Sequence, residues 1–179
     1  MKNILFLMLI TFNLVSCSNS IDPNYNNDFE MLEKLDTKNA ITFANEWHFN
    51  ASKIITYVNT QQVVFEFPDG RIIKKDLPKD SMYIAIAPYI NSTHTCSTHY
   101  ISSCDGEMKN EFVKVIIKEN NNNIIFNSLV KTMKNGFFEL WLPRNNDFSL
   151  HIDYNSMVGE ETLLTNENSK TCVTTIQLK

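Results

Sequence analysis

The stretch GFFELWLP, at residues 136–143, places aromatic and branched apolar side chains between a glycine and a proline. This composition is typical of a short strand bounded by turns. Similar apolar-rich runs lie on either side of it, at residues 112–118, 124–130, 148–154, 161–164 and 172–178. The segments between these runs are rich in Asn, Asp, Gly and Ser, which favour turns. Short strands at this spacing predict a β-sandwich-like domain in the C-terminal part of the chain.

The N-terminal part of the sequence follows a different pattern. Apolar residues recur with a helical period over residues 28–47, and the cluster DTKN at residues 36–39 interrupts it, so two short helices are expected. The stretch QVVFEFPDGRIIKK, at residues 62–75, predicts a β-hairpin because Pro-Asp-Gly supplies a turn between two strand-forming runs. Residues 81–87 predict a further strand.

These patterns together indicate a mainly β protein, α+β overall. A small helical and hairpin region at residues 28–80 is expected to precede a β-sandwich-like domain at residues 81–179. The formal net charge is −4, and the sequence has no basic stripe, which argues against nucleic-acid binding. The chain has 4 glycines and no glycine-rich phosphate loop, so a phosphate-binding enzyme is disfavoured.

The first residues predict export from the cytoplasm. Residues 1–16 have one early charge, Lys2, followed by a short apolar core, as in a secretory signal peptide. The sequence LVSC, at residues 14–17, resembles a bacterial lipobox, in which the thiol of Cys17 is acylated. We expect an extracytoplasmic, lipid-anchored protein whose residues 17–27 form a tether. An ordinary secretory signal with an incidental cysteine is the alternative.

The number of cysteines limits which thiols can form a disulfide. If Cys17 carries lipid, then Cys96, Cys104 and Cys172 remain, an odd number in an oxidising compartment. One intramolecular disulfide can form among them, and one thiol is left over. This leftover thiol indicates a functional role, although one structural disulfide beside an inert buried cysteine is the alternative.

Two histidines accompany these thiols. His94 and Cys96 are two positions apart, His99 follows three positions later, and Cys104 follows after five more. Cys172 is remote in sequence, but a terminal strand can bring it beside this loop. Thiolate and imidazole are preferred by Cu(I) and Zn(II). We therefore predict a metal site formed by Cys96, His99, Cys104 and Cys172, with His94 as a weaker candidate or an orienting group.

At these residues the chain resembles the CueP family of bacterial periplasmic copper-binding proteins. The resemblance is carried by six blocks in order, namely IAPY (86–89), THTCSTH (93–99), CDGE (104–107), NGF (135–137), WLPR (141–144) and TCVTT (171–175). It implies copper handling outside the cytoplasm, with the three cysteines and the adjacent histidine as the working residues. It also implies a dimer formed through the N-terminal region and a C-terminal β domain that bears the site.

Three functions follow as hypotheses. The first is a lipid-anchored protein that binds Cu(I) for resistance or delivery, with Cys96, Cys104 and Cys172 as candidate redox thiols that reduce Cu(II). Its partners would be copper ions, a client metalloprotein and a thiol-disulfide reductant. The second is a thiol-disulfide redox protein, and the third is a binding module with a structural Cys3His zinc site. The sequence leaves open whether the protein is an enzyme.

Overall fold

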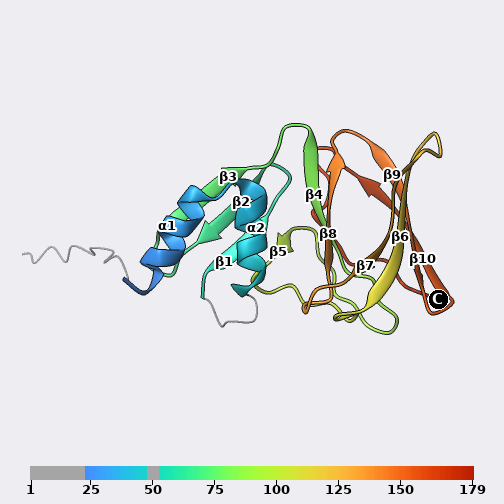
Figure 1. Ribbon diagram of the computed structural model, residues 1–179, viewed down its shortest axis with the longest axis horizontal. Coiled ribbons are helices and arrows are strands. Elements are labelled where there is room, and N and C mark those ends of the chain that lie inside the picture. The colour runs from blue at the N-terminus through green and yellow to red at the C-terminus, as the bar shows by residue number, and fades with distance from the viewer. Residues whose placement is uncertain (1–22, 48–52) are drawn as a thin grey trace, which may run out of the picture.

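The computed structural model describes residues 23–47 and 53–179. The predicted signal peptide, the expected lipidation site Cys17 and most of the tether lie outside the described residues. In the part of the chain that is described, no helix combines the length and the apolar character needed to cross a membrane. The predicted fold class is confirmed, because two short helices precede a succession of mostly antiparallel strands (Figure 1).

Two helices form the first part of the fold. They are α1 (Asn26–Lys34), which follows the 3₁₀ turn η1 (Pro23–Tyr25), and α2 (Thr37–Asn45). Asp36 separates them, because its carboxylate accepts a hydrogen bond from the backbone N–H of Asn39 at 2.9 Å and so caps α2. The buried apolar side chains of both helices belong to the core of the first sheet.

The first sheet has the strand order β3-β2-β1-β5, and its neighbouring strands are antiparallel. Its strands are β1 (Ile55–Val58), β2 (Gln62–Glu66), β3 (Ile72–Asp76) and β5 (His99–Tyr100). β2 and β3 form the predicted hairpin. β5 is only two residues long, and its pairing with β1 holds the Cys/His loop against the N-terminal sheet.

Two further sheets form the C-terminal sandwich, with strand orders β11-β4-β8 and β10-β9-β6-β7 (Figure 1). The strands are β4 (Ser81–Ile86), β6 (Phe112–Glu119), β7 (Ile124–Lys131), β8 (Phe138–Pro143), β9 (Asp147–Tyr154), β10 (Met157–Leu164) and β11 (Cys172–Val173). The run predicted at residues 172–178 is thus a strand only over its first two residues, which pair in parallel with β4. After Val173, the backbone instead makes single contacts with the segment that follows β4, such as the bridge between Tyr89 and Gln177.

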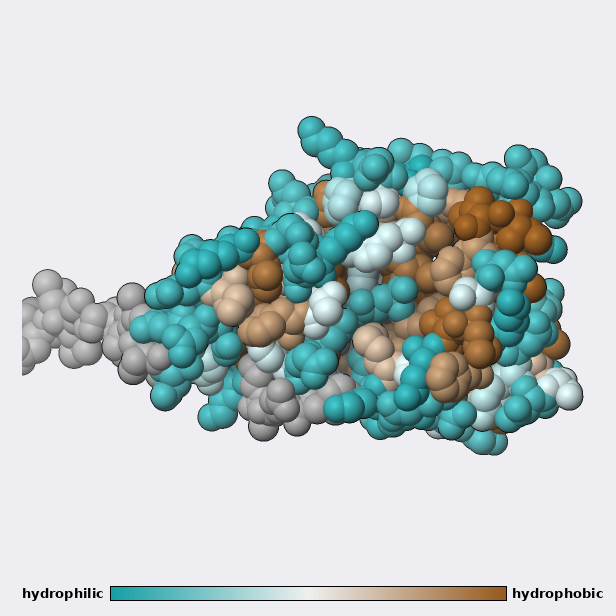
Figure 2. Space-filling view, viewed as in Figure 1, coloured by the Kyte–Doolittle hydropathy of each residue, from teal (hydrophilic) through white to brown (hydrophobic). Residues whose placement is uncertain are grey.

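β4 lies between two hydrophobic cores. Its side chains alternate, as in any strand, so that Tyr83 and Ala85 face the core shared with the helices. Met82 and Ile84 face the core inside the sandwich. Figure 2 shows the outside of the molecule, where hydrophobic residues are visible over the C-terminal strands and hydrophilic residues cover much of the remaining surface. The strand that is buried on both faces therefore connects the two halves of the fold.

Candidate metal centre

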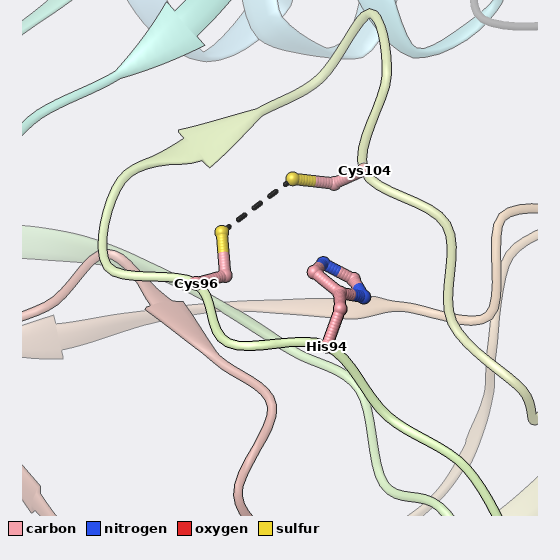
Figure 3. Close-up of side chains that lie close together, drawn as sticks. All are labelled: His94, Cys96 and Cys104. Carbon is pink, nitrogen blue, oxygen red and sulfur yellow. Dashed lines mark hydrogen bonds between the residues drawn. The ribbon is translucent and has the colours of Figure 1, made fainter.

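The predicted ligands gather where the first sheet meets the three-stranded sheet. His94 and Cys96 lie in the loop between β4 and β5, His99 is in β5, Cys104 lies in the turn after β5, and Cys172 begins β11. The side chains of His94, Cys96 and Cys104 converge on one space (Figure 3). The two shortest strands of the fold thus position two of the five candidates.

Hydrogen bonds fix the remote strand β11 against this loop. The backbone N–H groups of Thr171 and Cys172 both donate to the carbonyl of Ser97, at 2.9 and 3.2 Å. The hydroxyl of Thr171 donates to the carbonyl of Val58 at 2.5 Å and accepts from the backbone N–H of His99 at 3.1 Å. One threonine therefore links β1, β5 and β11.

The loop before β5 is held in the same way. The hydroxyl of Thr93 donates to the carbonyl of Thr174, and the hydroxyl of Thr174 donates to the carbonyl of His94, both at 2.6 Å. These two bonds order an otherwise exposed segment, residues 91–95. His94 is therefore held near the thiols although it lies in a loop.

The three cysteines of the described chain are free. The Sγ atoms of Cys96 and Cys104 are 3.6 Å apart, which is a hydrogen-bond distance for sulfur and longer than the roughly 2.05 Å of a disulfide. The Sγ of Cys96 also donates to the carbonyl of Thr98 at 3.1 Å, and the backbone N–H of Tyr100 donates to the Sγ of Cys104 at 3.3 Å.

Two sets of ligand atoms could each hold a metal ion. The outer donor set is His94, Cys96 and Cys104, and the inner donor set is His99, Cys104 and Cys172; within each set the ligand atoms lie within 4.8 Å of one another. His94 is exposed and Cys96 is half-buried, whereas all three residues of the inner donor set are buried. The structure thus brings all five predicted ligands together and arranges them by depth around Cys104.

The environment separates the three thiols by their acidity. The hydrogen bond from Cys172 and the nearby imidazole of His99 lower the pKa of Cys104 to about 3, against an opposing effect of desolvation. Burial raises the pKa of Cys96 to about 11. The hydrogen bond to Cys104, together with burial, raises the pKa of Cys172 well above its ordinary value. The surroundings therefore favour the thiolate form at Cys104 and the protonated form at Cys96 and Cys172.

His99 is buried without the hydrogen bonds that a buried imidazole normally makes. Its side chain is 0% exposed, and within the described chain neither Nδ1 nor Nε2 has a hydrogen-bond partner. Its ring lies 4.7 Å from the ring of Phe137 and 6.0 Å from that of Tyr83, measured between centroids. A buried polar group left unpaired costs on the order of 1–3 kcal/mol. A soft metal ion held beside Cys104 and Cys172 would give this imidazole a partner.

Sequence reasoning missed the residues that support His99. Tyr83 of β4 donates its hydroxyl to Oε1 of Glu139 at 2.7 Å, and the amide of Asn45 in α2 donates to the same oxygen at 2.9 Å. These bonds anchor the tyrosine ring that lies next to His99. The one available signal was the acidic Glu139 inside the apolar run FFELWL, since a charged residue in a buried strand needs a partner.

Two glycines allow the turn after Cys104 to pass close to another turn. A Cβ atom on Gly136, whose φ is +80°, would lie 2.5 Å from the carbonyl oxygen of Gly106. The backbone N–H of Gly106 donates to the carbonyl of Asn135 at 2.6 Å. Glycine is needed at position 136 both for its backbone conformation and for this approach.

Glu107 orders the beginning of the loop that carries His94. Its carboxylate accepts hydrogen bonds from the backbone N–H groups of Ile90, Asn91 and Ser92, at 2.8, 2.9 and 3.2 Å. Desolvation acts to raise the pKa of Glu107, but the hydrogen bonds from Asn91 and its neighbours outweigh it and lower the pKa to about 2. Glu107 thus remains a carboxylate over a wide pH range and holds the loop through charge-assisted hydrogen bonds.

The sequence matches the profile of a family described as "Periplasmic copper-binding protein CueP" over residues 30–177. The chain belongs to the CueP family. As a CueP protein it is extracytoplasmic and binds copper, and the Cys/His groups described above could hold the metal. The resemblance predicted from the six sequence blocks is confirmed.

A comparison of structures supports the fold of this CueP chain. The crystal structure of S.CueP superposes with a TM-score of 0.79 at 23% sequence identity, and the match covers 89% of this chain and 99% of that chain. No curated protein matches the sequence.

Proposed function

We propose that this CueP protein binds one Cu(I) ion with ligands drawn from Cys96, Cys104, Cys172 and His99, and with His94 as an additional ligand. The observation that carries the proposal is the buried imidazole of His99, which has no hydrogen-bond partner among the described residues and lies beside the sulfur atoms of Cys104 and Cys172. Sulfur and imidazole nitrogen are soft to intermediate ligands and favour Cu(I). The lowered pKa of Cys104 favours the thiolate, which is the form of cysteine that binds metal.

We further propose that two of the thiols reduce Cu(II). The nearest pair is Cys96 and Cys104, whose sulfur atoms are 3.6 Å apart. One thiol and one thiolate would form one S–S bond, release one proton and pass two electrons to two Cu(II) ions, giving two Cu(I) ions. Cys172 and His99 would remain to hold one of these ions. An odd number of cysteines suits this division between reduction and retention.

Three partners belong to this proposal. After the disulfide has formed, a thiol-disulfide reductant is needed to restore Cys96 and Cys104. Without it the protein acts once and sequesters copper; with it the copper is delivered to a client metalloprotein. A homodimer formed through the N-terminal region is also proposed, from the family resemblance.

Acylation of Cys17 would attach the protein to a bacterial membrane. The supporting observation is the sequence LVSC at residues 14–17, directly after an apolar signal-like segment. Membrane contact would then be made through the lipid alone. The tether at residues 17–27 would separate the folded part from the lipid surface.

The test mixes anaerobic, fully reduced protein with Cu(II) and follows both Cu(I), with a chromogenic chelator, and free thiols. The expected result is two Cu(I) ions for every two thiols lost, and one Cu(I) ion bound per chain. A variant with serine at Cys96, Cys104 and Cys172 serves as the control. Thiol loss without Cu(I), or equal Cu(I) formation in the triple-serine variant, would contradict the reduction.

The metal content of the protein after anaerobic reduction, measured together with the thiol count, separates the alternatives. Persistent zinc at one ion per chain after anaerobic reduction would favour a structural Cys3His site. Thiol oxidation without tight binding of either metal would favour a thiol-disulfide redox protein. Zinc is disfavoured because a structural site needs thiolates that stay reduced in an oxidising compartment.

A further inference from the structure

We propose that Cu(I) occupies two adjoining positions in this protein and passes between them on Cys104, loading and leaving through the outer donor set and resting in the inner one. The inference rests on the proposed function, since it concerns the path of the same ion. It is carried by the overlap of the two sets, which share one sulfur atom and differ in their exposure.

The inner donor set is the better resting place for Cu(I). Its three residues are buried, and His99 makes no other hydrogen bond within the described chain, so coordination removes the cost of an unpaired buried group. The rings of Phe137 and Tyr83 flank His99 and keep water away from it. An ion held here has no direct route to a ligand in solution.

The outer donor set is the part of the centre that solvent reaches. His94 is exposed, and it is the one member of either set that lines a pocket of about 400 Å³. Charged and hydroxyl groups surround this pocket, among them Asp105, Lys109 and Thr93. A copper-carrying or copper-accepting ligand that approaches through this pocket meets His94 before any of the thiols.

Cys104 makes the passage continuous. Because its sulfur atom belongs to both sets, an ion can exchange His94 and Cys96 for His99 and Cys172 without losing its bond to Cys104. No oxidation or reduction is involved in this step, since the ion stays Cu(I) and the ligands are exchanged one at a time. The inner donor set, where the ion rests, then determines the Cu(I) affinity. The outer donor set determines how fast the ion is exchanged with ligands in solution.

His94→Ala provides the first test, because an exposed loop residue can be replaced without filling or emptying the core. Cu(I) affinity is measured anaerobically by competition with a chromogenic chelator, and release is measured by stopped flow in excess chelator. Affinity is expected to change less than about threefold. Release should slow by about tenfold, because the exposed ligand through which the ion leaves is missing; this corresponds to about 1.4 kcal/mol in the barrier to release. The matched control is His151→Ala, in β9 and remote from the centre in the fold, which should change neither quantity.

The cysteine variants provide a second, independent measurement. Cys96→Ser leaves the inner set whole, so it should lose less affinity than Cys172→Ser and release the ion more slowly than the wild type. Cys172→Ser leaves the outer set whole, so it should bind more weakly and release faster than the wild type. Cys104→Ser removes a ligand from both sets and should lose the most affinity.

The outcomes distinguish this inference from the proposed function. If Cys104→Ser binds Cu(I) no more weakly than both other serine variants, or if His94→Ala and Cys96→Ser release at the wild-type rate, the two-position path is wrong while Cu(I) binding stands. If the reduced wild-type protein binds no Cu(I), the proposed function itself fails. Near-ultraviolet circular dichroism of each apo variant shows whether a loss of affinity comes from unfolding. If a cysteine variant is unfolded, the release rate of His94→Ala still tests the two-position path.

Discussion

Cys104 is the residue on which the chemistry of the centre depends, because it belongs to both donor sets and its surroundings favour the thiolate. Its pKa is lowered to about 3, whereas the pKa of Cys96 is raised to about 11 and that of Cys172 is raised further. An ion in the inner set must displace a proton from Cys172 but none from Cys104. We therefore predict that the logarithm of the Cu(I) affinity rises by about one per pH unit between pH 7 and pH 8.5.

The measurement is anaerobic competition against a chelator whose own pH dependence is known. A slope near two would mean that Cys96 and Cys172 both lose protons to the same ion. That result would contradict the division into two donor sets and leave copper binding intact. In Cys172→Ser the slope should again be near one, because Cys96 then supplies the proton that is released.

Glu107→Gln tests the loop that carries His94. The pKa of Glu107 in the folded protein, about 2, is below the ordinary value of 4.5, so its stabilising effect is complete above about pH 4.5 and is lost as the pH falls toward 2. We expect the variant to lose about 1 kcal/mol of unfolding free energy at pH 7, the usual value of a lost cap on backbone N–H groups. Urea unfolding at pH 7 and pH 3 measures this.

The variant should also be less sensitive to acid than the wild type over that interval, because the amide does not titrate. Glu167→Gln, at an exposed position in the loop before β11, is the control and should leave stability unchanged. Equal acid sensitivity in the Glu107→Gln protein and the wild type would show that the backbone hydrogen bonds of Glu107 contribute nothing measurable.

At the scale of elements, the crossing of two turns is the most constrained feature. Gly136→Ala puts a Cβ atom 2.5 Å from the carbonyl of Gly106 at a backbone φ of +80°. We expect a loss of about 3 kcal/mol, combining left-handed strain with displacement of the backbone. Because Gly106 is two residues from Cys104, Cu(I) affinity should fall as well.

Gly70→Ala is the matched control for Gly136→Ala. Gly70 also has a positive φ, +88°, but lies in an exposed hairpin turn. Its replacement should cost about 1 kcal/mol, the strain alone, and leave copper binding unchanged. Chemical unfolding measures the loss of stability, and chelator competition measures the Cu(I) affinity. Equal losses of stability in the two variants would show that the close approach of Gly136 to Gly106 adds nothing to the backbone strain.

The strands that sequence patterns located correctly are those with enough residues to show a period, such as the hairpin of β2 and β3 and the sandwich strands β6 to β9. β5 and β11 have two residues each, too few to show alternation. They are formed by tertiary hydrogen bonds, above all those of Thr171. Candidate ligands could therefore be named from residue type and spacing, whereas the depth of each candidate could not, because it depends on which strand each loop pairs with.

At the scale of the whole molecule, the predicted membrane anchor depends on residues outside the described part. We predict that Cys17→Ser shifts the protein from the membrane fraction to the soluble fraction, because the variant lacks the thiol to which the lipid would be attached. Fractionation of cells followed by immunoblotting measures this, and mass spectrometry of the wild type detects the lipid. An equally membrane-bound Cys17→Ser protein would contradict acylation, and Ser18→Ala should behave like the wild type.

Cys172 reaches Cys104 only when β11 has paired with β4, and the two residues are far apart along the chain. An unfolded chain therefore presents the nearby cysteines but not the inner donor set. A polypeptide that is exported before it folds would pass through the cytoplasm with little hold on copper and would acquire its affinity on the far side of the membrane. The order of export and folding would thus protect the cytoplasmic copper supply from a protein made to capture the metal elsewhere.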